Sequence, residues 1–269
     1  ELWAPSQAPM RAKQRIAEML DKDLNSITLH TTSMGGSFGR KRYDDFLLEA
    51  AFISQALFDR GSLNPIKLIW TREDDLSREH YRPSSYQTLR WSIDTPNTIS
   101  HTLLESQGPN SPQNKSTHSF FPFLSWGIET QKTQLSGKHI NGILRSVHHG
   151  YLAFSVCSFI DELSYIHKED PINYFSKHLK SPGLVAQFKA TIDPGTRYQD
   201  QRLKEVIQQV KTNSNWEQNS NQGSALGFAA YYCFKSYIAV VVKLSNHQNT
   251  LTVEHIWASV DCGTAVNPN

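Results

Sequence analysis

The stretch TTSMGGSFGRKRYDDFLLEAA, residues 31–51, places three glycines and a phenylalanine between a predicted strand and a predicted helix. Gly35, Gly36 and Gly39 lack a Cβ atom, so the backbone there can adopt positive φ and approach a ligand closely. A helix that starts directly after such a turn points its unpaired N–H groups and partial positive charge toward the glycines. These residues predict a contact site for an electron-rich or anionic group, with a plain strand-to-helix connection as the alternative.

A phosphate- or nucleotide-binding module is a second possible use of this turn. The turn lacks the Gly-Lys-Ser/Thr of a P-loop, and its glycines do not have the spacing of a dinucleotide-binding fingerprint. The sequence therefore gives the anion-loop interpretation no recognised motif, and it stays an alternative.

The hydrophobic pattern predicts helices and strands in alternation, which makes the fold class α+β. Predicted helices cover about 8–23, 43–60, 150–170 and 201–213, and predicted strands cover about 26–32, 65–71, 86–94, 99–108, 224–234, 236–246 and 250–261. We expect helix 43–60 to pack on strands 25–32 and 65–71, and helix 201–213 to be exposed. Residues 107–140 are rich in Ser, Pro, Gly and Asn, which is typical of long loops with one strand.

Composition limits the possible partners. The chain has 269 residues and a formal net charge of +2, which is too small for a nucleic-acid binder. The apolar run at residues 237–242 is far shorter than the roughly 18 to 20 residues of a membrane helix, so we expect no direct membrane span. Cys157, Cys233 and Cys262 are widely separated, so no CxxC pair predicts zinc or an iron–sulfur cluster. We expect all three to be buried as small hydrophobes.

Five segments, in order, resemble the large, molybdopterin-binding subunit of the xanthine dehydrogenase family. The resemblance is closest to the branch with isoquinoline 1-oxidoreductase beta subunits and membrane-associated aldehyde dehydrogenases. The segments are LWAPSQAP, GGSFGRKRYDDFLLEAA, IKLIWTREDDLSREHYRP, LRSVHHGYLAFSVCSFIDEL and VDCGTAVNPN. Any one of them is weak evidence, but five in the same order identify the family.

The resemblance implies a two-lobed molybdopterin-binding domain with mixed sheets flanked by helices. We expect a first α/β lobe over 1–83, strands and long loops over 84–140, and a second lobe over 141–269. Such an enzyme uses molybdenum on a pterin, with water as the oxygen source, to hydroxylate an N-heterocycle or oxidise an aldehyde. Its electrons pass to an iron–sulfur subunit or domain. The alternative on the same fold is a non-catalytic scaffold or interaction domain.

The resemblance also implies the residues that contact the cofactor. In the family the glycine–phenylalanine turn lies against the cofactor, with its amides near the molybdenum oxo ligand and its phenylalanine beside the substrate cavity. An arginine precedes the later helix at the same pocket. Carried over, the cofactor-binding residues are Gly35, Gly36, Ser37, Phe38, Gly39 and Arg145. His148 departs from the family, because a glycine is common at that position.

No residue of this chain is assigned a catalytic role. The general base of the family is a glutamate in a Gly-Glu-Pro-like segment, which we expect beyond Asn269. Asp161 and Glu162 are interpreted as a solvated helix face. The chain therefore resembles a central fragment of the subunit, and we expect the isolated chain to bind no molybdenum and to be inactive. The compartment, periplasmic or cytoplasmic, stays open.

Overall fold

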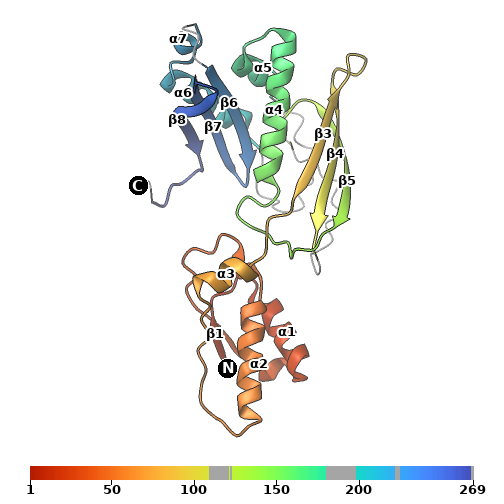
Figure 1. The fold of residues 1–269 in the computed structure, drawn as a ribbon, viewed down its shortest axis with the longest axis vertical. Helices are drawn as coiled ribbons and strands as arrows, with labels where there is room; N and C mark the ends of the chain where they lie inside the picture. Colours follow the sequence, from red (N-terminus) through yellow and green to blue (C-terminus); the bar gives the residue numbers. More distant parts are fainter. Residues whose placement is uncertain (109–120, 122, 180–197, 222–224, 268–269) are drawn as a thin grey trace. The chain divides into compact units, whose positions relative to one another are not determined.

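A computed structural model describes residues 1–108, 121, 123–179, 198–221 and 225–267. The chain forms two compact units (Figure 1). The first unit contains residues 1–84, 105–113 and 134–147, and the second contains residues 85–104, 114–133 and 148–269. Helices and sheets are mixed in the described chain, which confirms the predicted α+β class. The division at 83/84 and 140/141 stays a prediction.

The first unit is built on a small parallel sheet and three helices. Strand β1 (Leu2–Ala4) pairs in parallel with β2 (Leu29–Thr31), and α1 (Pro9–Leu20) connects them. After β2 come a 3₁₀ turn, η2 (Arg40–Arg42), then α2 (Asp45–Phe58) and α3 (Arg72–Arg78). A further 3₁₀ turn, η1 (Leu24–Ser26), precedes β2. Their apolar core is formed by Ala4, Ala12, Ile16, Ala17, Ile27, Leu47 and Ala51.

One expectation about this unit is wrong, because residues 65–71 form no strand on which helix α2 could pack. Helix α2 packs against α1, and its Leu47 and Ala51 share the apolar core with Ile27 of segment 25–32. The alternation of side chains in IKLIW is typical of a strand, but a strand also needs a neighbour to pair with its backbone, and among the described residues this stretch has none. The next segment starts helix α3, where Thr71 and Asp74 form a capping box.

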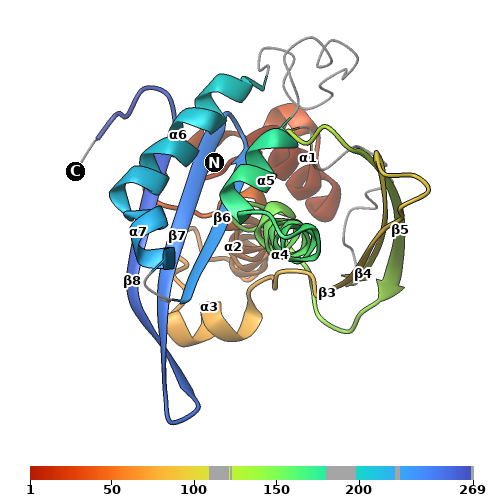
Figure 2. The same ribbon diagram turned by 90° about the horizontal axis from the view of Figure 1, so that it is seen from above.

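The second unit contains two three-stranded sheets (Figure 2). One has the order β3 (Ser85–Trp91), β4 (Thr98–Gln107), β5 (Gly127–Ser136), and the last residues of β4 and β5 run into the first unit. The other is antiparallel, with the order β6 (Ala225–Cys233), β7 (Ser236–His247), β8 (Thr250–Asp261). A turn joins β7 to β8, with positive φ at Gln248 and Asn249.

Helices cover these sheets in the second unit. They are α4 (His149–His167), α5 (Pro171–Lys177), α6 (Asp200–Asn213) and α7 (Trp216–Asn221). The expectation that helix 201–213 is exposed is wrong, because one side of α6 packs on β7 and β8. Its buried residues recur at helical spacing, as Leu203, Val206, Ile207 and Val210.

The cysteines differ from one another in burial. Cys157 is buried as expected, Cys233 is half-buried, and Cys262 is exposed, so the expectation is wrong for Cys262. Cys262 follows the last residue of β8 and lies outside the packed part of the sheet. Within the described ranges, none of the helices has the length and apolar character needed to cross a membrane.

Candidate functional site

The glycine turn lies in the first unit as an exposed connection. Residues 35–39 are neither helical nor in a strand, as predicted. Gly35 and Gly39 have φ values of 58° and 99°, and Phe38 also has a positive φ, of 50°. The Phe38 side chain is 64% exposed. The turn therefore presents an aromatic ring and several amides to the outside of this unit.

The sequence predicted a helix directly after the glycine turn, but helix α2 begins later. The 3₁₀ turn η2 intervenes, with the Arg40 N–H donating to the Ser37 carbonyl at 2.8 Å, and α2 starts only at Asp45. Asp44 and Asp45 occupy the N-terminus of α2, where negative charge already meets the helix dipole. The expectation that helix N–H groups point at the glycines is wrong, and the anion-loop interpretation loses its main physical support.

Arg145 lies directly beside this turn. Its backbone N–H donates to the Phe38 carbonyl at 2.8 Å, and its guanidinium carbon lies 5.1 Å from the centre of the Phe38 ring. Gly39 explains how the two segments approach so closely, because a Cβ atom there would lie 2.1 Å from the Ile143 carbonyl oxygen. The structure thus brings together the two segments that the sequence resemblance singled out.

Residues that the sequence interpretation did not assign hold the Arg145 segment in place. The Tyr43 hydroxyl accepts the Ile143 N–H at 2.5 Å. Arg82 donates to the carbonyls of Val147 and Arg145, at 2.5 and 2.8 Å. Tyr43 and Arg82 both fall within the motifs quoted from the sequence. The motifs therefore pointed to these two residues, although not to the groups that they contact.

His80 packs against Tyr43 and Gly142, next to the Arg145 segment. Its ring stacks on Tyr43 with 3.7 Å between ring centres, and its Cβ lies 2.3 Å from where a Cβ on Gly142 would be. Gly142 therefore has to be glycine for this packing. Burial lowers the pKa of His80, which favours the neutral imidazole in the stack.

The N-terminal motif contacts the opposite side of the turn. The Ser37 hydroxyl donates to the Gln7 side-chain oxygen at 3.1 Å, and the Gln7 N–H donates to the Lys41 carbonyl at 2.8 Å. The Lys41 ammonium donates to the Met34 carbonyl across the turn. LWAPSQAP, GGSFGR and LRSV, which are far apart in sequence, thus meet at one place in the first unit.

Arg40 fixes the exit of the turn. Its guanidinium makes two hydrogen bonds to Asp45, at 2.8 and 2.9 Å, and lies within 4.0 Å of Asp75 and Glu79. Burial lowers the pKa of Arg40, but the hydrogen bond and charge of Asp45 outweigh that effect and raise it overall. Arg40 is therefore charged and connects the turn to α2 and α3. The surrounding carboxylates neutralise its charge.

The turn supplies backbone hydrogen-bond donors that no group in the described part of the chain accepts. Among the described residues, the N–H groups of residues 35–39 have no acceptor, and Arg145 has no carboxylate partner. Gly35 has open space on its Cβ side. Such amides beside the Arg145 guanidinium form a donor set that suits an electron-rich oxo group. The residues present therefore fit the cofactor that the sequence resemblance implies.

The other singled-out polar residues lie in the second unit. His148 Nδ1 is 2.6 Å from the Tyr151 hydroxyl, whereas His149 Nδ1 is 3.1 Å from the Tyr231 hydroxyl. The adjacent histidines thus contact different partners. Within the part of the chain that the structure describes, no group of three or more His, Cys, Asp or Glu residues is arranged to hold a metal ion.

Comparison with known proteins agrees with the motifs. Residues 1–119 match the molybdopterin cofactor-binding domain family. The whole chain aligns, at 23% identity, with isoquinoline 1-oxidoreductase subunit beta of Brevundimonas diminuta, covering 34% of that protein. It also aligns at 23% identity with the membrane-bound aldehyde dehydrogenase (pyrroloquinoline-quinone) of Gluconacetobacter polyoxogenes, covering 37% of it. The chain spans about a third of the length of these relatives.

A solved structure shows that the fold is shared. The aldehyde oxidoreductase of Desulfovibrio gigas superimposes with a TM-score of 0.61 at 15% identity, over 90% of this chain and 28% of that one. These similarities confirm the resemblance drawn from the five motifs. They do not assign a role to any single residue of the turn.

Proposed function

We propose that this chain forms part of the cofactor-binding subunit of a molybdenum hydroxylase. The proposal is supported by the match of residues 1–119 to the molybdopterin cofactor-binding domain family and by the similarity to isoquinoline 1-oxidoreductase subunit beta. In this proposal Gly35, Gly36, Ser37, Phe38, Gly39 and Arg145 contact the cofactor. The observation that carries it is the row of amides in residues 35–39, which have no acceptor among the described residues, beside the Arg145 guanidinium over the Phe38 ring.

When bound, the molybdenum pterin supplies the two-electron oxidation that places an oxygen from water on carbon. The chain's own residues bind the cofactor and orient it. The amides of the turn donate to electron-rich oxygens, and the Arg145 guanidinium compensates negative charge beside them. The exposed Phe38 ring offers a flat apolar surface, which suits an aldehyde or N-heterocycle as substrate. We assign no general base to this chain.

The proposal also includes an electron-transfer partner and a cellular compartment. One relative is by name a subunit of a larger enzyme, which favours a separate electron-transfer partner for this chain as well. We propose that the partner is an iron–sulfur subunit or domain, and that the enzyme works in the periplasm or the cytoplasm.

We further propose that the isolated 269-residue chain holds no molybdenum and oxidises no aldehyde. Its free donors come from one exposed turn, where water competes for each hydrogen bond and leaves about 0.5–1.5 kcal/mol per bond. A few such bonds give only weak binding. Metal analysis of the purified chain tests this: near-stoichiometric molybdenum would show that the chain is a complete binding unit by itself.

The role of the turn is tested by Gly36→Val in a cofactor-loaded subunit that contains this chain. Gly36 has no positive φ, and a Cβ there would meet only the Phe38 ring, at 3.6 Å, so the fold tolerates it while the side chain fills the approach to the amides. We expect molybdenum content to fall about tenfold, equivalent to about 1.4 kcal/mol. Gly127→Val, on β5, is the matched control. Full molybdenum content in Gly36→Val would overturn the assignment.

A further inference from the structure

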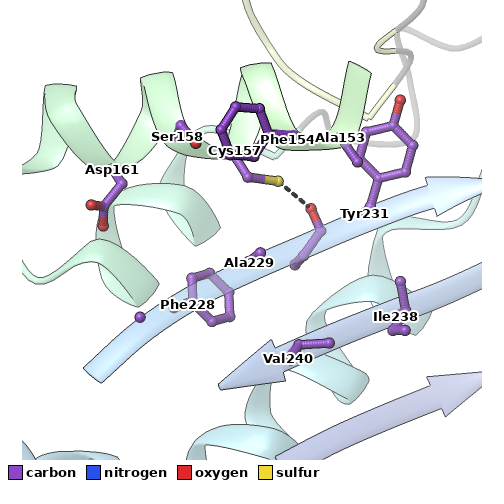
Figure 3. A pocket seen from close by; sticks show the side chains of 12 residues that line it. Ala153, Phe154, Cys157, Ser158, Asp161, Phe228, Ala229, Tyr231, Ile238 and Val240 are labelled. Atoms are coloured by element: carbon purple, nitrogen blue, oxygen red, sulfur yellow. Dashed lines mark hydrogen bonds between the residues drawn. The ribbon is translucent and has the colours of Figure 1, made fainter. Parts of the chain in front are cut away.

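The second unit has an open apolar groove that the cofactor proposal does not use. Helix α4 forms one wall of the groove, and β6 and β7 form its floor (Figure 3). Its volume is about 370 Å³. Most of the lining is apolar, and polar groups come from the Tyr231 hydroxyl and from Ser158 and Asp161 of α4.

The floor of the groove continues across the whole sheet. Cross-strand partners in an antiparallel sheet share a face, so the register places three apolar rows on this face. The rows are Gly227–Val242–Ile256, Ala229–Val240–Ala258 and Tyr231–Ile238–Val260. Ile256 and Val260 are each 58% exposed. Helix α4 packs on the β6 end of these rows, so we call the six residues from β7 and β8 the open sheet face: Ile238, Val240, Val242, Ile256, Ala258 and Val260.

The opposite face of the same sheet is covered by helix α6. Tyr237, Ala239 and Val241 alternate with the open residues of β7 and are almost fully buried, on the side where α6 packs. Arg202 of α6 also makes a bidentate pair with Asp261, at 2.6 Å. One face is thus closed by a helix with matching charges, and the other is apolar and open over β7 and β8.

Asp161 lies at the groove without a cation. Among the described residues, no Lys, Arg or His comes within ion-pair distance of its carboxylate. Burial against the groove raises its pKa. A partner that supplies a positive charge at this point would therefore be favoured over one that supplies none.

The dimensions of the open sheet face suit one helix. Strands in a sheet lie about 4.8 Å apart, so β7 and β8 together offer a strip about 10 Å wide. An α-helix with its side chains is about 10 Å across. Because α4 packs on β6, a single helix beside it would complete a second layer over β7 and β8.

We propose that the open sheet face binds one amphipathic helix, with an apolar stripe on the six face residues and a Lys or Arg opposite Asp161, supplied by the rest of a larger subunit. This source rests on the proposed function and on the length of the curated relatives, of which this chain spans about a third. A second copy of the chain fits less well, because its own open face carries no cation to meet Asp161.

The probe is a fluorescein-labelled, 18-residue helical peptide of Leu, Ala and Gln, with Leu at i, i+3, i+4 and i+7 spacing and one Lys beside the stripe. We expect saturable binding to the 269-residue chain by fluorescence anisotropy. Val260→Lys should weaken binding at least about tenfold. Val266→Lys places the same change at an exposed valine outside the sheet and should leave binding within about twofold.

Charge recognition is tested with a second peptide in which Gln replaces the Lys. Asp161→Asn should weaken the Lys peptide about fivefold and leave the Gln peptide unchanged. Glu162→Gln, an exposed neighbour outside the groove lining, should change neither. Ile256→Lys repeats the test of the face should Val260→Lys misfold by circular dichroism.

Absence of saturable peptide binding would overturn the inference. So would self-association of the chain, seen by sedimentation and abolished by Val260→Lys, because the open sheet face would then be an interface between copies. The peptide measurements need no cofactor, so their failure is distinguishable from failure of the molybdenum proposal.

Discussion

The backbone N–H of Arg145 donates to the carbonyl of Phe38 at 2.8 Å, while the Arg145 guanidinium lies 5.1 Å from the centre of the Phe38 ring. Two motifs more than a hundred residues apart in the chain are joined by this double contact. The hydrogen bond fixes the path of the backbone, and the cation over the ring fixes the orientation of both side chains. The proposed cofactor site therefore depends on tertiary packing within the first unit.

Gly39→Ala should destabilise the first unit strongly. Gly39 has a φ of 99°, and a Cβ would lie 2.1 Å from the Ile143 carbonyl oxygen, so both strain and collision arise. We expect the free energy of unfolding to fall by about 2–4 kcal/mol in urea denaturation. Gly35→Ala is the control: its φ is 58° but its surroundings are open, so about 1 kcal/mol should be lost. Equal losses in the two variants would contradict the packing argument.

The contact between Arg145 and Phe38 should appear as a coupling energy. In a double-mutant cycle with Arg145→Gln and Phe38→Leu, we expect a coupling of about 0.5–1 kcal/mol in the free energy of unfolding. Both substitutions leave the backbone hydrogen bond in place. The contact would be energetically unimportant if the two effects simply added.

Arg40→Gln should lower stability more than loss of an ordinary surface charge. Three carboxylates, on Asp45, Asp75 and Glu79, surround the Arg40 guanidinium and would be left to repel one another. We expect a loss of about 2–4 kcal/mol in thermal or urea unfolding. Added salt should recover part of this loss, because it screens the exposed part of the repulsion.

Arg72→Gln is the matched control for Arg40. Its side chain is 70% exposed and pairs with Asp75 three residues along α3. Such a pair contributes about 0–1 kcal/mol. A loss as large as that of Arg40→Gln would show that the half-buried position of Arg40 does not matter.

The second unit should lose stability as the pH falls from about 6.5 toward 4. His101 is buried, with its ring nitrogens 3.1 Å from Thr130 and Gln87, and burial lowers its pKa to about 4. Between these pH values the unfolded chain takes up a proton that the folded chain excludes, so protonation favours unfolding. Burial likewise lowers the pKa of His149 and His178 to about 4.

His101→Gln should reduce the slope of stability against pH in that window, measured by urea midpoints at several pH values. His30→Gln, at a half-exposed site in the first unit, provides the comparison and should leave the slope of the second unit unchanged. An unaltered slope in His101→Gln would mean that His101 does not contribute.

The sequence by itself determined the element types wherever local pattern is sufficient. Helix α4 and strands β6 to β8 were predicted from the pattern of apolar residues that each segment carries in its own sequence. The exposed glycine turn was also predictable, because positive φ at Gly35 and Gly39 is a local property of residues without a Cβ.

Only the tertiary structure decided which motifs meet and which segments find partners. Residues 65–71 have a strand pattern but no strand, because backbone pairing depends on a neighbour that the local sequence cannot specify. Helix α2 starts at Asp45, after the 3₁₀ turn η2, and Arg40 of that turn pairs with Asp45 of α2 and Asp75 of α3. The same holds for Phe38 and Arg145: their contact forms because Gly39 lets the segment around Ile143 approach, and sequence spacing carries no information about that distance.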